Sequence, residues 1–290
     1  MTDRLKEKVA LITGGSSGIG RAAAQLFSRE GAKVVIADIN AEGGEETVRS
    51  ITEEGGESLF LRTDVSKSAE VEALIKEIVQ RYSRLDCAYN NAGILGDVVS
   101  LVDHTEDNWN RTIETNLKGT WLCMKYEIPQ MLEQGSGSIV NTTATTGLYV
   151  GGKYRSAYSA SKAGIVSLTK VAALEYAEYG LRVNVICPSA RTPLMEQFFE
   201  NNPEAEADFT AQMPMGRIFA PEEIVEGALW LCSDASSFVT GHVLAAEGGF
   251  GKTLLDCCSY PRNPLCQSNG PTAACRCLSS VRANTTTCVS

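Results

Sequence analysis

The sequence predicts an α/β protein in which one parallel sheet is covered by helices on both faces. Short apolar runs typical of strands alternate with helical patterns, and this alternation is typical of parallel sheets. With 290 residues and 43% hydrophobic content, the chain is long enough for one large α/β domain or two small ones. No long linker or internal repeat divides residues 5–250. We therefore expect one domain there.

The expected elements follow one another as short strands and amphipathic helices. The first strand is Val9–Ile12, and a helix-compatible stretch from Arg21 to Arg29, closed by Gly31, leads to a second strand at 33–37. Further strands are expected near residues 58–63, 85–90, 137–142, 182–187 and 242–246. The clearest helix has apolar residues spaced i, i+3, i+4, i+7 and i+8, which line one helical face: Val71, Leu74, Ile75, Ile78 and Val79.

A glycine-rich turn with the spacing GxxxGxG follows the first strand, at Gly14, Gly18 and Gly20. Glycines let backbone amides approach a pyrophosphate, and the N-terminus of the next helix adds partial positive charge. Alone, the pattern fits a simple tight turn equally well. Asp38 ends the second strand eighteen residues past Gly20, where a carboxylate can accept hydrogen bonds from a ribose diol. Together these features favour dinucleotide binding.

The same aspartate predicts which dinucleotide binds. A carboxylate at Asp38 would repel a 2'-phosphate, and Ile39 and Asn40 supply no cation to offset that repulsion. We therefore expect NAD rather than NADP as the cofactor.

Tyr158 and Lys162 are four residues apart, which places a phenol and an ammonium on one helical face. A cation beside a phenol favours the phenolate and lowers its pKa, so that tyrosine can act as a general acid or base. An isolated pair at this spacing is more often an ordinary, partly exposed one. The glycine-rich turn upstream favours the catalytic interpretation.

Charge and cysteine content set limits on partners and location. The net charge of −9 and the pI near 4.9 argue against nucleic acid as a main partner. No signal peptide and no bilayer-length apolar stretch is found, so we expect a cytoplasmic protein without a membrane partner. Four cysteines lie in apolar segments as expected core residues: Cys87, Cys123, Cys187 and Cys232.

The other six cysteines crowd into the last 34 residues, a region rich in Ser, Thr, Asn and Pro without helical or strand periodicity. A disulfide-stapled appendage or a zinc site is conceivable, but the region has no histidine and no paired CxxC motif. We interpret residues 252–290 as a Cys-rich, disordered tail beside a domain over residues 1–251, and we expect no metal site.

With these motifs in order, residues 5–250 resemble the short-chain dehydrogenase/reductase family. Asn90-Asn91-Ala92-Gly93 looks like its NNAG motif, and Asp64-Val65 resembles the pair that contacts the adenine. The resemblance implies a single Rossmann-like, doubly wound domain with a seven-stranded parallel sheet. It also implies a homotetramer or homodimer, with helices around 108–128 and 157–178 at the dimer face.

The resemblance also implies the roles of individual residues. Asn116, Tyr158 and Lys162 correspond to the catalytic residues, with Asn116 holding a water in a proton relay. The implied cofactor-binding residues are Gly14, Ser16, Ser17, Gly18, Ile19, Gly20, Asp38, Ile39, Asp64, Val65, Asn91, Ala92, Gly93, Tyr158, Lys162, Pro188 and Thr192.

Two departures from the family pattern affect the expected site. Counting from Asn141 places Ala144 where the family has a serine that hydrogen-bonds the reacting oxygen, so Thr143 or Thr145 would have to substitute. Without a substitute, the loss resembles removal of one oxyanion-hole donor, roughly a hundred- to thousandfold in rate. In addition, Ser189 replaces a glycine, and the loop from Pro188 to Pro193 is one residue short.

The function expected from the sequence is NAD-dependent interconversion of a secondary alcohol and a ketone, with Tyr158 as acid and base. A substrate lid over residues 191–217, with Phe198, Phe199, Phe209, Met213 and Met215, favours a hydrophobic or cyclic small molecule, although an amphipathic helix packed on the body fits equally. Ala144 leaves open a non-redox isomerase or cyclase, or an inactivated variant. A silent NAD-binding protein is a further alternative.

Overall fold

The computed structural model describes residues 3–149, 153–188, 199–200, 203–211 and 213–251. Its centre is a seven-stranded, wholly parallel sheet with strand order β3-β2-β1-β4-β5-β6-β7. The strands are β1 (Val9–Thr13), β2 (Lys33–Asp38), β3 (Ser58–Arg62), β4 (Cys87–Asn90), β5 (Gly137–Thr142), β6 (Leu181–Pro188) and β7 (Val243–Ala246). The predicted fold class is confirmed.

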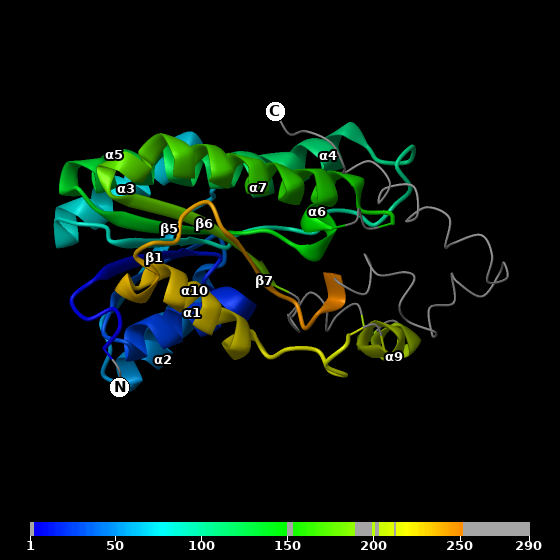
Figure 1. Cartoon of the computed structure of the whole chain (residues 1–290), viewed down its shortest axis with the longest axis horizontal. Coiled ribbons are helices and arrows are strands. Elements are labelled where there is room, and N and C mark those ends of the chain that lie inside the picture. The colour runs from blue at the N-terminus through cyan, green and yellow to red at the C-terminus, as the bar shows by residue number, and fades with distance from the viewer. Residues whose placement is uncertain (1–2, 150–152, 189–198, 201–202, 212, 252–290) are drawn as a thin grey trace, which may run out of the picture.

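Helices cover both faces of this sheet (Figure 1). On one face lie α1 (Gly18–Arg29), α2 (Ala41–Glu53) and α10 (Pro221–Cys232), and on the other lie α3 (Ser68–Tyr82), α5 (Gly119–Gln134) and α7 (Ser156–Tyr176). The shorter helices are α4 (Glu106–Ile113), α6 (Thr145–Leu148) and α9 (Pro203–Ala211). Single turns of other helical types occur at η1 (Glu114–Lys118), η2 (Ala177–Tyr179) and η3 (Asp234–Ser236).

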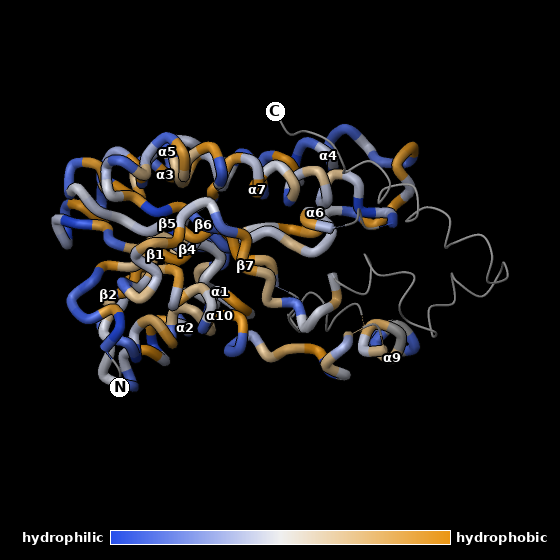
Figure 2. Tube along the Cα trace, in the orientation of Figure 1, coloured by the Kyte–Doolittle hydropathy of each residue, from blue (hydrophilic) through white to orange (hydrophobic). Residues whose placement is uncertain are grey.

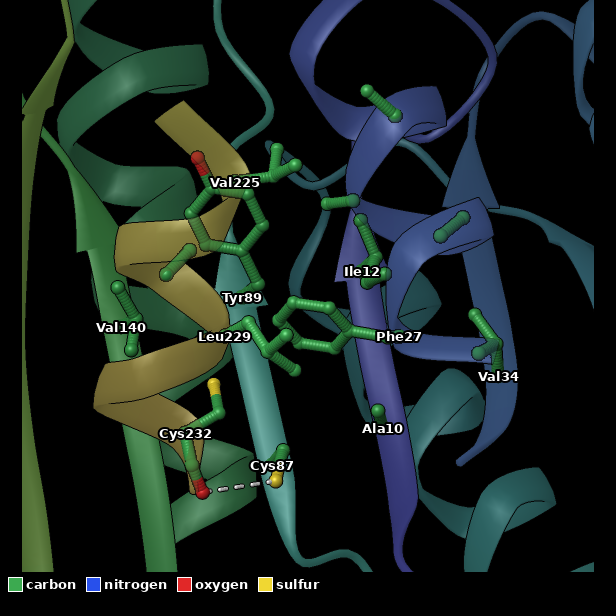
Figure 3. Close-up of a cluster of buried hydrophobic side chains, with 14 of the residues drawn as sticks. Ala10, Ile12, Phe27, Val34, Cys87, Tyr89, Val140, Val225, Leu229 and Cys232 are labelled. Atoms are coloured by element: carbon green, nitrogen blue, oxygen red, sulfur yellow. Dashed lines mark hydrogen bonds between the residues drawn. The ribbon is translucent and has the colours of Figure 1, made fainter. Parts of the chain in front are cut away.

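Strand side chains alternate between two cores because successive residues point to opposite faces. Ile12, Val34 and Tyr89 pack against Phe27 of α1 and Leu229 of α10 (Figure 3). The intervening strand residues pack against α3, α5 and α7: Val9, Leu11, Val35, Ala88 and Ile139. Burial on both faces explains why these strands read as continuous apolar runs, and Figure 2 shows the hydrophobic segments gathered at the sheet.

The strand order places the loops that carry the sequence motifs at one edge of the sheet. Strands β1 and β4 are neighbours in the sheet although β2 and β3 lie between them in sequence, so the winding direction reverses there. Ligands of doubly wound sheets bind outside the carboxyl ends of the strands at such a reversal. The glycine-rich turn follows β1, and Asn91 follows β4. Helix α1 begins at Gly18 instead of Arg21, because the last two glycines form its first turn.

Several sequence predictions are settled by the described residues, and others lie outside them. Cys87, Cys123, Cys187 and Cys232 are buried free thiols, as predicted. The Cys-rich tail and Thr192 lie outside the described residues. Within the described part of the chain, no helix is long and apolar enough to span a membrane. The same residues contain no His, Cys, Asp and Glu cluster suited to a metal ion.

Candidate active site

The glycine-rich turn forms a cradle in which the backbone packs too tightly for side chains. Gly14 has a φ of +70°, and a Cβ added to it would lie 2.9 Å from Ala92 Cα. A Cβ added to Gly20 would lie 2.0 Å from the Gly14 carbonyl oxygen. Both positions therefore require glycine, and the turn is held against the chain that follows β4.

The cradle opens onto the N-terminus of α1. Ser17 precedes the helix, and its exposed side chain forms no capping hydrogen bond. Arg21 N donates to Ser17 O at 3.1 Å, which is the first i to i−4 bond of the helix. The preceding amides of the first turn have no intrahelical acceptor, so they can bind an anion such as a pyrophosphate. The buried Ser16 and Ile19 support this turn from within.

Asp38 places its carboxylate beside the cradle at the end of β2. Its Oδ2 accepts from Ser16 N at 3.1 Å, and its Oδ1 accepts from Asn40 N at 3.0 Å. Ile39, next in sequence, is 61% exposed. The nearby Arg21 guanidinium donates to Ser16 O at 2.6 Å and to Glu46 Oε2 at 2.7 Å. The local cation is therefore already paired with a carboxylate.

The chain after β4 is hydrogen-bonded to the glycine-rich turn. Thr13 Oγ1 accepts from Asn91 N and from Ala92 N, each at 3.1 Å. Asn91 Nδ2 donates to Thr13 O at 3.3 Å and to Gly14 O at 3.4 Å. The structure therefore brings these predicted cofactor-binding residues together.

Asp64 and Val65, the pair expected to contact the adenine, lie after β3. Asp64 Oδ1 accepts from Ser66 N at 2.9 Å, and Val65 is buried against Gly119, where an added Cβ would lie 2.9 Å from Val65 Cγ2. Pro188 ends β6 and is half-buried. Thr192 is the one predicted cofactor residue outside the described part of the chain.

Tyr158 and Lys162 lie on α7 at the carboxyl end of the sheet. Lys162 is buried, its Nζ donates to Thr142 O at 3.0 Å, and Nζ lies 5.7 Å from the centroid of the Tyr158 ring. Thr143 Oγ1 donates to Lys162 O at 2.7 Å, which fixes the helix backbone against the end of β5. The cation therefore has a defined position next to the phenol.

Burial dominates the electrostatics of this pair. Desolvation raises the pKa of Tyr158 to about 12, and the charge of Arg155 opposes this only in part. Desolvation also lowers the pKa of Lys162 to about 8. The expectation that Lys162 lowers the pKa of Tyr158 is therefore wrong for this cleft: desolvation is the largest effect on the half-buried Tyr158, and Lys162 is not among the groups that shift its pKa.

Asn116 lies in η1, a π-helical turn between α4 and α5. Its Nδ2 donates to Ile94 O at 2.9 Å and to Ser161 Oγ at 3.1 Å, and its Oδ1 accepts from Ile94 N at 2.8 Å. A Cβ added to Gly93 would lie 3.1 Å from Asn116 Oδ1 and 3.4 Å from Lys162 Nζ. Asn116 and Lys162 thus flank the same glycine, and π-turns of this kind often mark functional sites.

Ala144 immediately precedes α6, in extended conformation and half-buried, and offers no hydroxyl. Thr143 is excluded as a substitute donor because its hydroxyl is donated to Lys162 O and the residue is 1% exposed. Thr145, the first residue of α6, is half-buried and remains the candidate within this loop.

The described part of the substrate lid contributes an aromatic cluster. The ring centroids of Phe199 and Phe209 are 6.0 Å apart, and those of Phe209 and Phe250 are 5.8 Å apart. Met213 is buried, and Met215 is 60% exposed. Phe198 lies outside the described residues.

Sequence reasoning missed the contact that joins this cluster to the catalytic loop. Tyr149, which follows α6, donates its hydroxyl to Glu247 Oε1 at 3.3 Å. Glu247 Oε2 also accepts from Gly251 N at 3.0 Å. Gly248 and Gly249, with φ of +62° and +83°, mark a tight turn there and are the only sequence signal of this arrangement.

Comparison with known proteins agrees with this geometry. A family model described as Enoyl-(Acyl carrier protein) reductase matches residues 14–251. A 2,5-dichloro-2,5-cyclohexadiene-1,4-diol dehydrogenase from Sphingobium indicum is 41% identical over 248 residues, which are 85% of this chain and 98% of that protein. The chain belongs to the short-chain dehydrogenase/reductase family.

Other members of the short-chain dehydrogenase/reductase family are similarly close. A cyclohexanol dehydrogenase from Acinetobacter sp. is 38% identical over 251 residues, covering 86% of this chain and 97% of that protein. The crystal structure of levodione reductase superposes with a TM-score of 0.83 and 35% identity, over 86% of this chain and 99% of that one. The protein is thus an oxidoreductase of a family that uses nicotinamide cofactors.

The packing of the cradle predicts that Gly20→Ala abolishes dinucleotide binding, because the new methyl group would meet the Gly14 backbone at 2.0 Å. NADH titration followed by fluorescence, with circular dichroism to verify folding, tests this. Gly227→Ala is the matched control, since its methyl group meets only the side-chain ends of Leu244 and Ile186, at 3.0 and 3.1 Å. Unchanged NADH affinity in the Gly20 variant would contradict the assignment.

Proposed function

We propose that the protein is an NAD-dependent dehydrogenase/reductase that interconverts a secondary alcohol and a ketone on a hydrophobic or cyclic small molecule. One observation carries the proposal. Lys162 Nζ, beside Tyr158, lies next to Gly93, in the segment that is hydrogen-bonded to the glycine cradle. The Tyr158–Lys162 pair and the glycine cradle therefore lie together at the carboxyl ends of β1, β4 and β5, as an acid–base pair acting beside a bound dinucleotide would require.

The residues present fit a nicotinamide dinucleotide. Gly14 and Gly20 let the turn pack closely on the chain after β4, the first turn of α1 offers free amides, and Asp38 offers a carboxylate for the ribose diol. Lys162 would hold the nicotinamide ribose. When bound, the nicotinamide supplies the hydride acceptor for oxidation or the hydride donor for reduction.

The chain's own residues move the proton. In reduction Tyr158 donates its phenolic proton to the carbonyl oxygen, and in oxidation the phenolate accepts the proton of the substrate hydroxyl. Because burial raises the pKa of Tyr158 to about 12, the phenol is the form present at neutral pH. Asn116 would hold the water that exchanges this proton with solvent.

Two observations support a hydrophobic or cyclic substrate. Two relatives are named for cyclic alcohols, a cyclohexadiene diol and cyclohexanol. In this chain, Phe199, Phe209 and Phe250 form an aromatic cluster beside the turn that contacts Tyr149. Aromatic surface of this kind favours an apolar ring over a small polar substrate.

The quaternary structure is proposed as a homodimer or homotetramer. Apolar side chains are exposed on the two helices expected at the dimer face: Trp121 on α5, and Val171 and Leu174 on α7. A face of this kind is suited to burial against a second copy. We also propose that residues 1–251 form the complete catalytic domain.

Tyr158→Phe is expected to lower turnover by about 10²- to 10⁴-fold, the usual contribution of a general acid or base. Alcohol oxidation by the unmodified enzyme should accelerate as pH rises towards the pKa of Tyr158 near 12, since only the phenolate accepts a proton. Initial rates of NADH formation against pH measure both effects. Tyr154→Phe, an exposed tyrosine nearby in sequence, is the control and should leave the rates unchanged. A fully active Tyr158 variant would refute the mechanism.

Cofactor choice is expected to depend on Asp38. The enzyme should bind NADH more tightly than NADPH, and Asp38→Asn, which removes the charge but keeps one acceptor, should tighten NADPH binding by about tenfold or more. Calorimetric titration with each dinucleotide measures the preference. Glu45→Gln is the control, because it removes an equal charge from an exposed glutamate on the same helix α2 as Glu46 and leaves the Arg21–Glu46 ion pair intact. Tighter binding of NADPH than NADH by the unmodified protein would overturn the NAD assignment.

Ala144→Ser is expected to raise turnover, by up to about a hundredfold if it restores one donor to the reacting oxygen. Assays with cyclohexanol and NAD measure the change. Thr145→Val, made in parallel, tests the remaining hydroxyl of this loop. No gain from the serine together with a loss in the Thr145 variant would show that Thr145 already supplies the donor.

Ala144 also favours one competing function, non-redox isomerase or cyclase chemistry in the same pocket. In that case the dinucleotide would only position the substrate. Conversion of a cyclic ketone or alcohol without any change in NADH absorbance would identify this alternative.

A further inference from the structure

Four buried polar side chains form a row between the sheet and the helices α5 and α7, behind the candidate active site. They are Glu127 of α5, Asn90 of β4, Asn141 of β5 and Thr169 of α7, and each is at most 3% exposed. Asn90 and Asn141 are direct partners in the register of β4 and β5. Polar groups this deeply buried need hydrogen-bond partners, so the row can be followed atom by atom.

Thr169, at one end of the row, determines which atom donates and which accepts in each hydrogen bond. Thr169 Oγ1 donates its single hydrogen to Ile165 O at 2.8 Å, so it must accept from Asn141 Nδ2, 3.0 Å away. Asn141 Oδ1 is therefore the acceptor for Asn90 Nδ2, also at 3.0 Å. The second hydrogen on Asn90 Nδ2 reaches Glu127 Oε2 at 3.0 Å.

Two oxygens at the other end of the row remain without a partner. Asn90 Oδ1 and Glu127 Oε1 are both buried and accept no hydrogen bond in the structure. They belong to two side chains that already share one hydrogen bond. Neither an amide oxygen nor an ionised carboxylate can donate, so a single proton on the carboxyl group is what would pair these two atoms.

We propose that Glu127 is protonated in the folded protein and donates its proton to Asn90 Oδ1, so that the carboxylic acid and the amide form a closed pair. This pair would satisfy both unpaired oxygens with one added proton and no further group. It would also avoid an uncompensated charge in the core.

The surroundings of Glu127 favour the neutral acid. Burial raises its pKa to about 8, opposed only by the hydrogen bond from Asn90. None of the ion pairs within the described part of the chain involves Glu127, and the groups facing it from β4, β5 and α7 are amides and a hydroxyl. The nearby titratable group is the buried Cys123 thiol, one turn earlier on α5. Burial raises the pKa of this thiol well above its usual value.

The closed pair would act as a positioning device for the active site. Asn90 precedes Asn91, which bonds the glycine cradle, and Asn141 precedes Thr142, whose carbonyl holds Lys162 Nζ. Lys162 and Thr169 lie two turns apart on the same face of α7, so the row fixes this helix at a second point. Glu127 is thus a positioning residue. This role rests on the proposed function, whereas the protonation of Glu127 is independent of it.

The proton can be tested through the pH dependence of stability. A pKa raised from 4.5 to about 8 in the folded state gives stability that is complete below about pH 4.5 and is lost as pH rises to about 8. Glu127→Gln keeps both hydrogen bonds of the pair without a titrating group. The ratio of the unfolding equilibrium constants of the two proteins should therefore change by about tenfold per pH unit across this range.

Urea titrations at several pH values measure this ratio, and Glu133→Gln, an exposed glutamate on the same helix, is the matched control that should stay flat. A ratio for Glu127→Gln that is also constant with pH would overturn the proposal. Infrared spectra of the unmodified protein give a second readout, since a buried carboxylic acid has a C=O band that should persist at pH 7 and disappear above pH 8. Absence of this band at pH 6 would equally overturn it, even if the glutamine variant fails to fold.

The positioning role is tested by NADH affinity and turnover. Glu127→Leu removes the acid and leaves Asn90 Oδ1 and one hydrogen of Asn90 Nδ2 without partners, so NADH affinity and turnover should both fall. Glu127→Gln should restore them. If the two variants lose NADH affinity and turnover equally while the unmodified protein shows the infrared band, the positioning role is refuted. The proposal that Glu127 is protonated would then still stand. If every variant and the unmodified protein lack NADH turnover, the proposed function fails instead.

Discussion

The candidate active site depends on the close backbone packing where β1 and β4 end side by side. Gly14 and Gly20 approach Ala92 and each other so closely that no Cβ fits, and Thr13 Oγ1 accepts two amides of the segment after β4. This packing sets the distance between the glycine cradle and Gly93, against which Lys162 and Asn116 lie. A small change in the cradle would therefore displace Lys162 and Tyr158 as well.

The charge balance of the cleft follows from its burial. The pKa of Tyr158 rises and that of Lys162 falls, so the cleft disfavours both anion and cation. Lys162 is compensated by the Thr142 carbonyl, a dipole and not a charge.

The sequence predicted the fold well because strands buried on both faces leave uninterrupted apolar runs, as Val34 to Ala37 illustrate. It also located the glycine cradle, since Gly14 and Gly20 reflect a backbone requirement that any sequence must satisfy. The π-turn around Asn116 could not be predicted, because its residues fit an ordinary helix equally well.

Sequence-based predictions that depend on side-chain direction or on burial were less accurate than those of the fold. Thr143 and Thr145 are equivalent in sequence, and only the tertiary structure shows that the first donates to Lys162 O. The pKa of Tyr158 was predicted from its neighbour Lys162 alone, whereas the structure shows that desolvation is the larger effect. Glu127 gave no signal at all, since a single glutamate in an amphipathic pattern is usually exposed.

Under the proposed function, these features bear on the direction of the reaction. A phenol with a pKa near 12 is a ready proton donor at neutral pH but a scarce base, so reduction starts from the abundant form and oxidation from the rare one. Ala144 adds no hydroxyl to share the reacting oxygen, and Thr143 is committed to Lys162. Thr145 is the candidate hydroxyl of this loop left to assist Tyr158, so under the proposed function the preferred direction depends on the charge that bound ligands bring near the phenol.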